Sequence, residues 1–158
     1  MRIGLGTDIH KLVSKKPLIL GGVNIPFELG VEAHSDGDVI YHALSDAILG
    51  ALALGDIGLY FPDNLISTKD INSAEILKFV FDKICEHSYK ICNIDICVTL
   101  EKPKLRNYID LMRSNIAKIL HCEMNQISIK CGTNEGLDSI GENKAIKVDA
   151  IVLLEKGK

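Results

Sequence analysis

The chain has 158 residues, of which 47% are hydrophobic and 25% are charged, and its formal net charge is −3. This length suits one domain with a substantial core, and we expect residues 1–158 to form a single domain. The charge excludes a basic surface for nucleic acid, and no apolar run has membrane-spanning length, so neither nucleic acid nor a membrane is an expected partner.

The five cysteines form no C-x-x-C pair and are odd in number. They indicate reduced thiols of an intracellular compartment rather than a disulfide framework. The first residues enter a predicted strand directly, so we expect no signal or transit peptide. A bacterial cytoplasmic protein fits this pattern, as does a plastid stromal protein whose transit peptide has been trimmed.

Residues 2–10 alternate with period two, which predicts a β-strand. Its apolar face, which we expect to be buried, consists of Ile3, Leu5, Thr7 and Ile9. The other face carries two glycines, which leave room for a bulky neighbour, and then Asp8 and His10. Alternate strand residues share a face, so these two side chains could bind one metal ion. The alternative is a surface Asp and His at a strand end.

Residues 37–54 have apolar side chains at helical spacing and predict an amphipathic helix. Asp36 or Ser35 could cap its start, and Gly55 follows its end.

His42 lies on a different stripe of this helix, one turn from Asp38 and one turn from Asp46. A histidine ligand usually has its second nitrogen fixed by a hydrogen-bond partner, and carboxylates serve that purpose. Together with Asp8 and His10, His42 would complete a site with three protein ligands and one open position, as catalytic zinc requires. The alternative is a solvated helix face with an isolated histidine.

The remaining elements follow in chain order. Residues 18–20 suggest a short strand, residues 72–87 a helix capped by Asn72 or Ser73, and residues 94–100 another strand. Pro103 is well placed to start a helix through Leu120, and strands follow at 127–129 and 145–154. These alternating elements indicate an α/β or α+β fold with one sheet, and we predict the α+β class, with one mainly four-stranded sheet and helices on one face. The last strand is apolar on both faces, so the open face is expected to meet another subunit.

The motifs extend beyond the three candidate ligands. They are AHSDGD at 33–38, LGDIG at 54–58, FPD at 61–63, PK at 103–104 and TNE at 133–135. With Asp8, His10 and His42, they make the whole chain resemble the 2-C-methyl-D-erythritol 2,4-cyclodiphosphate synthase family of the non-mevalonate isoprenoid pathway.

The resemblance implies two divalent ions. One is zinc, with manganese as an alternative, at Asp8, His10 and His42; the other is magnesium or manganese at Glu135 when substrate is bound. It also implies a homotrimer whose sheets pack around a threefold axis, with active sites between neighbouring subunits.

The resemblance also assigns the substrate contacts. His34 and Thr133 are the candidate catalytic residues, with His34 and Ser35 holding the attacking phosphate and Thr133 stabilising the transition state. The candidates around the sugar and the adjoining pocket are Ser35, Asp46, Asp56, Ile57, Gly58, Phe61, Pro62, Asp63, Asn64 and Leu65. The candidates around the cytidine and phosphates are Leu100, Pro103, Lys104, Leu105, Arg106, Gly132 and Asn134.

The implied reaction is an intramolecular phosphoryl transfer, catalysed by a phosphorus–oxygen lyase. The 2-phosphate of 4-diphosphocytidyl-2-C-methyl-D-erythritol 2-phosphate attacks the β-phosphorus and expels CMP, which closes a cyclic diphosphate. Two anionic groups must approach each other, so positioning and charge neutralisation dominate the catalysis. The zinc-like ion would act on the β-phosphate as a Lewis acid.

Two other classes remain open at this point. One is a metallohydrolase with water at the open position, and the other is a non-catalytic trimer stabilised by metal. Lys104, Thr133 and Glu135 argue against both, because neither needs phosphate contacts.

One region departs from a common version of the family. Many members have an aromatic residue where this chain has Thr7, and Gly-Phe-x-Gly-Arg where it has Ser139 and Glu142, with Lys144 close by. In the family this region lines a cavity on the threefold axis that can hold isoprenoid diphosphates. The acidic substitution predicts an axial cavity without such a ligand.

Overall fold

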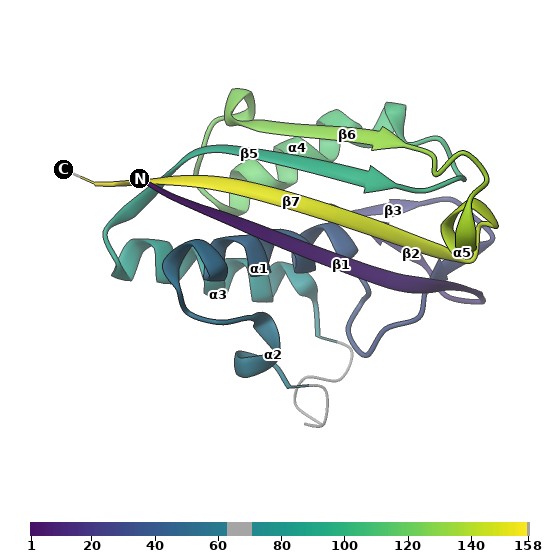
Figure 1. Ribbon diagram of the computed structural model, residues 1–158, viewed down its shortest axis with the longest axis horizontal. Coiled ribbons are helices and arrows are strands. Elements are labelled where there is room, and N and C mark those ends of the chain that lie inside the picture. The colour runs from purple at the N-terminus through teal and green to yellow at the C-terminus, as the bar shows by residue number, and fades with distance from the viewer. Residues whose placement is uncertain (63–70, 158) are drawn as a thin grey trace.

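A computed structural model describes residues 1–62 and 71–157. The fold is α+β, with a five-stranded mixed sheet, a separate two-stranded hairpin, and helices packed on one face of the large sheet (Figure 1). The strand order is β4-β1-β7-β5-β6. Only β5 and β6 are parallel neighbours; the other neighbours are antiparallel.

The elements have the following bounds. The large sheet contains β1 (Arg2–Ser14), β4 (Leu29–Val31), β5 (Tyr89–Thr99), β6 (Ile127–Gly132) and β7 (Ala145–Lys156), and the hairpin contains β2 (Leu18–Leu20) and β3 (Val23–Ile25). The α-helices are α1 (Val39–Leu52), α2 (Ile57–Tyr60), α3 (Ser73–Glu86), α4 (Ile109–Ile119) and α5 (Asp138–Gly141), and short 3₁₀ turns span Arg106–Tyr108 and Met124–Gln126.

The prediction of a four-stranded sheet is wrong by one strand. The additional strand, β4, has three residues with a glycine at its centre, and it pairs with the last residues of β1. A segment this short has too few residues for alternation to mark it, so its pairing with β1 reveals it.

Pro103 does not start a helix, as the sequence had suggested. The chain passes Pro103 and buries Leu105 before a 3₁₀ turn leads into α4 at Ile109. Burial of Leu105 anchors residues 103–105 as a loop, so helix formation is delayed to the amphipathic segment that follows.

The contact between β1 and α1 is close enough to exclude side chains. A Cβ atom on Gly4 would lie 1.9 Å from the carbonyl oxygen of Ala47, and one on Gly6 would lie 2.0 Å from that of Ala43. The expectation that the glycine face receives a bulky neighbour is therefore confirmed, and the neighbour is the backbone of α1.

The expectation that the apolar face of β1 is buried is wrong for the chain on its own. Ile3 is 71% exposed, Leu5 66% and Ile9 58%. Because α1 packs on the glycine face, these side chains lie on the other face, next to the 43% exposed Ile151 of β7. No described helix of this chain covers them, which leaves an apolar surface on the sheet.

The ends of α1 differ from the predicted caps. Asp38 caps the start, rather than Asp36 or Ser35, and Ala53 in a left-handed conformation ends the helix before Gly55 is reached. The first turn therefore begins after the AHSDGD segment, which leaves the side chains of that segment available for other contacts.

Asp38 also joins the helix to the hairpin. Its carboxylate accepts hydrogen bonds from the backbone N–H groups of Gly21 (3.0 Å) and Gly22 (2.7 Å), as well as from the first turn of α1. Burial raises the pKa of Asp38 to about 6, although these N–H donors favour its ionised form. The carboxylate thus fixes the turn between β2 and β3 against the start of α1.

None of the helices in the described part of the chain has the length and apolar character needed to cross a membrane.

The β1–α1 contact yields a stability prediction. Gly6→Ala should lower the free energy of unfolding by roughly 1–3 kcal/mol, because the added methyl group meets helix backbone that cannot move aside. Gly50→Ala is the matched control: it lies in α1 with its nearest neighbour at 4.0 Å, and it should stabilise the helix by roughly 0.5–1 kcal/mol. Denaturant unfolding measures both, and wild-type stability of Gly6→Ala would contradict the packing described.

Candidate metal and phosphate site

Asp8, His10 and His42 come together where β1 packs against α1. One ligand atom from each lies within 4.8 Å of the others. The Oδ2 atom of Asp8 is 3.2 Å from Nε2 of His10 and 3.1 Å from Nδ1 of His42. The predicted proximity of these three residues, two from the strand and one from the helix, is therefore confirmed.

The backbone determines which nitrogen of His10 faces Asp8. The Nδ1 atom lies 3.0 Å from the carbonyl oxygen of Glu32. A carbonyl oxygen can only accept, so Nδ1 carries the proton and donates. In the neutral ring, Nε2 then presents a lone pair toward Asp8.

Hydrogen bonds through the side chains of Ser73 and Asp36 orient His42 in a similar way. Its Nε2 atom lies 2.8 Å from Oγ of Ser73 and 3.1 Å from Oγ of Ser35. The Ser73 hydroxyl donates to a carboxylate oxygen of Asp36, so it accepts from Nε2–H of His42. The Nδ1 lone pair consequently faces Asp8.

The three donor groups thus converge on one point with their lone pairs. Burial raises the pKa of Asp8, whereas hydrogen bonds and charge interactions with His10 and His42 lower that pKa when these rings are protonated toward it. In the neutral tautomers that Glu32 and Ser73 favour, these donors are absent and the lone pairs face the carboxylate. An ionised carboxylate and two imidazole nitrogens repel one another unless a cation lies between them. This donor set fits a divalent ion such as zinc, with room for a ligand that is not protein.

The carboxylates on either side of His42 have other partners. Asp38 caps α1, while Asp46 accepts a 2.8 Å hydrogen bond from the backbone N–H of Ile57. The second nitrogen of His42 is therefore held by neither neighbouring carboxylate. Its partner is a serine, Ser73, at the start of α3. Burial raises the pKa of Asp46, and the nearby negative charges of Asp56 and Asp8 act in the same direction.

The metal-ligand group lies in the wall of a pocket of about 330 Å³. The predicted site residues that also line it are His34, Ser35, Asp46, Ile57, Gly58 and Phe61. The Nε2 atom of His34 is buried and has no hydrogen-bond partner among the described residues. Such an atom is costly to leave unpaired, so it favours a polar ligand in this pocket.

The remaining residues predicted for this pocket divide into two groups. Asp56 caps α2 by accepting a 3.1 Å hydrogen bond from the N–H of Leu59, and Pro62 follows α2 at the end of the first described range. Asp63, Asn64 and Leu65 lie outside the described residues.

A second, smaller pocket of about 130 Å³ holds the other predicted group. It is lined by Leu100, Pro103, Lys104, Leu105, Cys131, Gly132 and Thr133. Just beyond it, the Thr133 hydroxyl donates to Glu135 at 3.0 Å, and the backbone N–H of Asn134 donates to Glu101 at 2.8 Å. Cys131 was not predicted, because a cysteine on an alternating strand gives no signal of lining a pocket.

The two pockets lie at the same end of the sheet but on different strands. Asp8 pairs with Val148, Val148 pairs with Val98, and Val98 pairs with Cys131. Three strand spacings of about 4.8 Å therefore separate β1 from β6, or about 14 Å. Within one chain, the metal-ligand group and the Lys104–Thr133 group do not meet.

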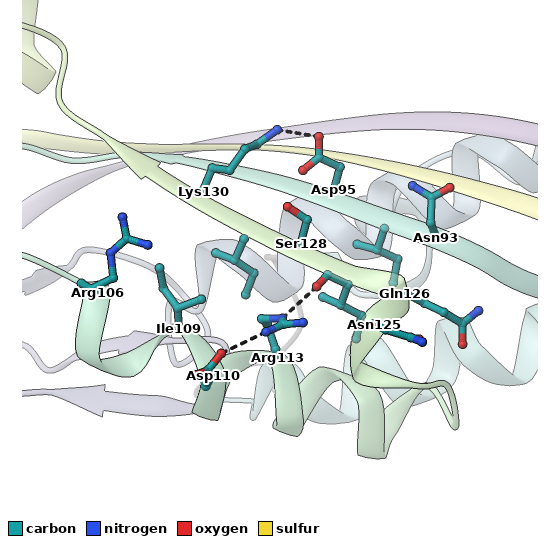
Figure 2. A pocket seen from close by; sticks show the side chains of 13 residues that line it. Asn93, Asp95, Arg106, Ile109, Asp110, Arg113, Asn125, Gln126, Ser128 and Lys130 are labelled. Carbon is teal, nitrogen blue, oxygen red and sulfur yellow. Dashed lines mark hydrogen bonds and ion pairs between the residues drawn. The ribbon is translucent and has the colours of Figure 1, made fainter.

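A larger hollow, of about 660 Å³, runs along the free edge of β6 beside α4 (Figure 2). Its charged groups largely neutralise one another: Lys130 pairs with Asp95 at 2.6 Å, and Arg113 pairs with Asp110 at 2.9 Å. Arg106 is the one predicted site residue that lines it. Internal pairing and the absence of the metal-ligand group make this hollow a poor candidate for the reaction centre.

Comparisons with known proteins agree with the site geometry. The model of the YgbB family matches residues 1–155. The chain belongs to the YgbB family. A relative from Brachyspira hyodysenteriae, named 2-C-methyl-D-erythritol 2,4-cyclodiphosphate synthase, is 52% identical over 158 residues, which is 100% of both chains.

Solved structures of related proteins give the same result. The bifunctional IspDF of Campylobacter jejuni has a TM-score of 0.94 and 43% identity, and the match covers 98% of this chain but only 42% of that longer one. IspF of Plasmodium falciparum, solved as a CDP complex, has a TM-score of 0.89 and 42% identity over 99% of this chain and 97% of the other. The YgbB fold thus extends over essentially the whole chain.

For this YgbB family member we expect tight binding of one divalent ion per chain, at Asp8, His10 and His42. His42→Ala should abolish stoichiometric zinc binding, because it removes one of three ligands. His87→Ala is the matched control, since this exposed histidine lies at the end of α3 and contacts the backbone of that helix. Elemental analysis after dialysis measures the ion, and undiminished zinc in His42→Ala would refute the assignment.

Proposed function

We propose that this protein converts 4-diphosphocytidyl-2-C-methyl-D-erythritol 2-phosphate to 2-C-methyl-D-erythritol 2,4-cyclodiphosphate and releases CMP. The observation that carries the proposal is the convergence of Asp8, His10 and His42 in a pocket, within a chain that matches named cyclodiphosphate synthases over its full length. The protein would act as one catalytic domain in a soluble compartment, and its bacterial relatives favour the bacterial cytoplasm.

The pocket beside the metal ligands suits the methylerythritol and its 2-phosphate. His34 would donate a hydrogen bond to the attacking phosphate from its otherwise unpartnered Nε2, and Ser35 would hold the same group. Asp56 and Gly58, at the start of α2, would bind sugar hydroxyls. Phe61 lines this pocket, and Pro62, Asp63, Asn64 and Leu65 are proposed as further substrate contacts.

The smaller pocket suits the cytidine and its phosphates. The related IspF from Plasmodium falciparum was solved with CDP, and a cytidine diphosphate is part of the proposed substrate. Leu100, Pro103 and Leu105 offer apolar walls, whereas Lys104 supplies a positive charge and Thr133 a hydroxyl for phosphate oxygens. Gly132, Asn134 and Arg106 would complete this half of the site.

Metal ions would hold the phosphates that these residues approach. We propose zinc, or alternatively manganese, at Asp8, His10 and His42, and magnesium or manganese at Glu135, whose exposed carboxylate is a hard oxygen ligand. When bound, these ions supply Lewis acidity and positive charge to the diphosphate.

The side chains would then position the 2-phosphate and the diphosphate of the substrate against each other. None of them would attack the substrate itself. An oxygen of the 2-phosphate forms a bond to the β-phosphorus, and the bond between that phosphorus and the oxygen of CMP breaks. His34, Ser35 and Thr133 would align the attacking and leaving oxygens, and Lys104 would neutralise charge on the leaving side. The reaction requires no protein nucleophile.

The distance between the two pockets favours an active site shared by two copies of the chain. About 14 Å separates the two strands within one chain, which is more than two adjacent phosphates span. The exposed Ile3, Leu5, Ile9 and Ile151 give the sheet an apolar face that a second copy can cover. We propose a homotrimer in which each site combines the metal ligands of one subunit with the Lys104–Thr133 group of its neighbour.

The direct test is release of CMP. Wild-type protein should form one CMP per cyclic product, and His42→Ala should lose nearly all of this activity. Asp46→Asn keeps an acceptor for the N–H of Ile57 but removes a negative charge from the pocket wall beside the metal ligands, and it should cost roughly 10- to 100-fold in activity. His87→Ala should turn over like the wild type. Full turnover by metal-free His42→Ala would contradict the proposed function.

Mixing inactive variants tests the shared site. Asp8→Ala and Lys104→Ala should each lack activity, and co-assembled trimers of the two should regain part of it, since some interfaces pair intact residues. Asp8→Ala mixed with His42→Ala is the control, because both ligands come from one chain and no intact metal group can form. A monomer in sedimentation, or no recovery in verified mixed trimers, would count against the assembly.

A further inference from the structure

Ser73 connects a metal-ligand candidate to a carboxylate that lies outside the ligand group. It is fully buried at the start of α3. Its Oγ atom lies 2.8 Å from Nε2 of His42 on α1, and it donates to Asp36 in the AHSDGD segment. The same carboxylate accepts a 3.1 Å hydrogen bond from the backbone N–H of Ser73. The start of α3 is thereby held, at one hydroxyl, to the AHSDGD segment and to the helix that follows that segment.

The chemistry of the groups determines the direction of each hydrogen bond between Asp36, Ser73 and His42. An ionised carboxylate only accepts, so the Ser73 proton points to Asp36 and the Ser73 lone pair faces His42. His42 must then carry its proton on Nε2, with a bare lone pair on Nδ1 toward Asp8. Ser35 also approaches Nε2, at 3.1 Å, but its Oγ already accepts a 3.1 Å hydrogen bond from the backbone N–H of Gly37, and no carboxylate among the described residues orients its hydroxyl proton.

We propose that Ser73, held by Asp36, is a positioning residue that fixes the tautomer and ring orientation of His42 for metal binding. This inference rests on the proposed metal site, and it concerns a residue that touches neither the ion nor the substrate.

The physical reason lies in a competing state. If His42 carried its proton on Nδ1, it would donate to Asp8 at the 3.1 Å distance observed, and a single hydrogen bond would occupy two of the three metal ligands. An ion would have to break that bond before it could bind. By accepting from Nε2–H, Ser73 disfavours this closed state and leaves the ligand atoms available.

The first experiment compares zinc affinity, measured by competition with a chelator in the absence of substrate. Ser73→Ala should bind zinc roughly 10- to 100-fold more weakly than the wild type. Ser45→Ala is the matched control: Ser45 is also fully buried and lies on α1 near His42, but its hydroxyl has no hydrogen-bond partner among the described residues. Its zinc affinity should not change. Equal affinities for Ser73→Ala and the wild type would overturn the proposal.

The second experiment reads the tautomer directly. In metal-free wild-type protein, the imidazole ¹⁵N shifts of His42 should report a proton on Nε2, and in Ser73→Ala they should move toward the Nδ1–H form. Ser73→Thr keeps the hydroxyl and should restore both the wild-type shifts and the affinity. A proton on Nδ1 of His42 in the wild type would overturn the proposal, whatever the variants do.

These outcomes are independent of the reaction. Zinc affinity and ¹⁵N shifts require no substrate, so a wild-type protein that binds zinc but releases no CMP would end the proposed function and leave the role of Ser73 standing. Conversely, CMP release with an unperturbed His42 in Ser73→Ala would end only the role of Ser73.

Discussion

The structure depends on the contact between the glycine face of β1 and the backbone of α1. Carbonyl oxygens of Ala43 and Ala47 occupy the space that a Cβ atom at positions 6 and 4, respectively, would need. Such an approach brings the helix axis closer to the sheet than ordinary side chains allow. Because His42 precedes Ala43 on the same helix and Asp8 follows Gly6 on the same strand, the packing that forms the core also brings the candidate metal ligands together.

Hydrogen bonds then turn this proximity into a defined donor set. His10 is oriented by a backbone carbonyl and His42 by a buried serine, so both neutral rings present lone pairs toward Asp8. Neither orienting partner is a carboxylate on the helix stripe of His42. A cation would offset the electrostatic cost of three electron-rich groups at one point, so this arrangement supports the proposed metal site.

The separation of the two pockets links chemistry to assembly. A sheet keeps its strands about 4.8 Å apart, so Asp8 in the middle of β1 cannot approach Thr133, just beyond the end of β6, within one chain. The side of the sheet away from the helices carries exposed isoleucine and leucine side chains, which is expensive for an isolated subunit. In the proposed trimer, a partner subunit would relieve both constraints at once, by covering the apolar face and by supplying the other half of the site.

The sequence by itself determined the α+β class, the long helices, and the common face of Asp8 and His10, because period-two and helical patterns report which side chains share a face. The addition of His42 to that pair rested on the family resemblance, since no local pattern shows that a strand and a helix meet. The sequence could not reveal β4, whose three residues are too few for a pattern, or the start of α4, which burial of Leu105 delays. It also misassigned the buried face of β1, since alternation shows that two faces differ but not which one a helix will cover. Only the tertiary structure decided that, together with the pairing of Ser73 with His42, because a contact between residues 31 positions apart depends on how α1 and α3 pack and not on any local pattern.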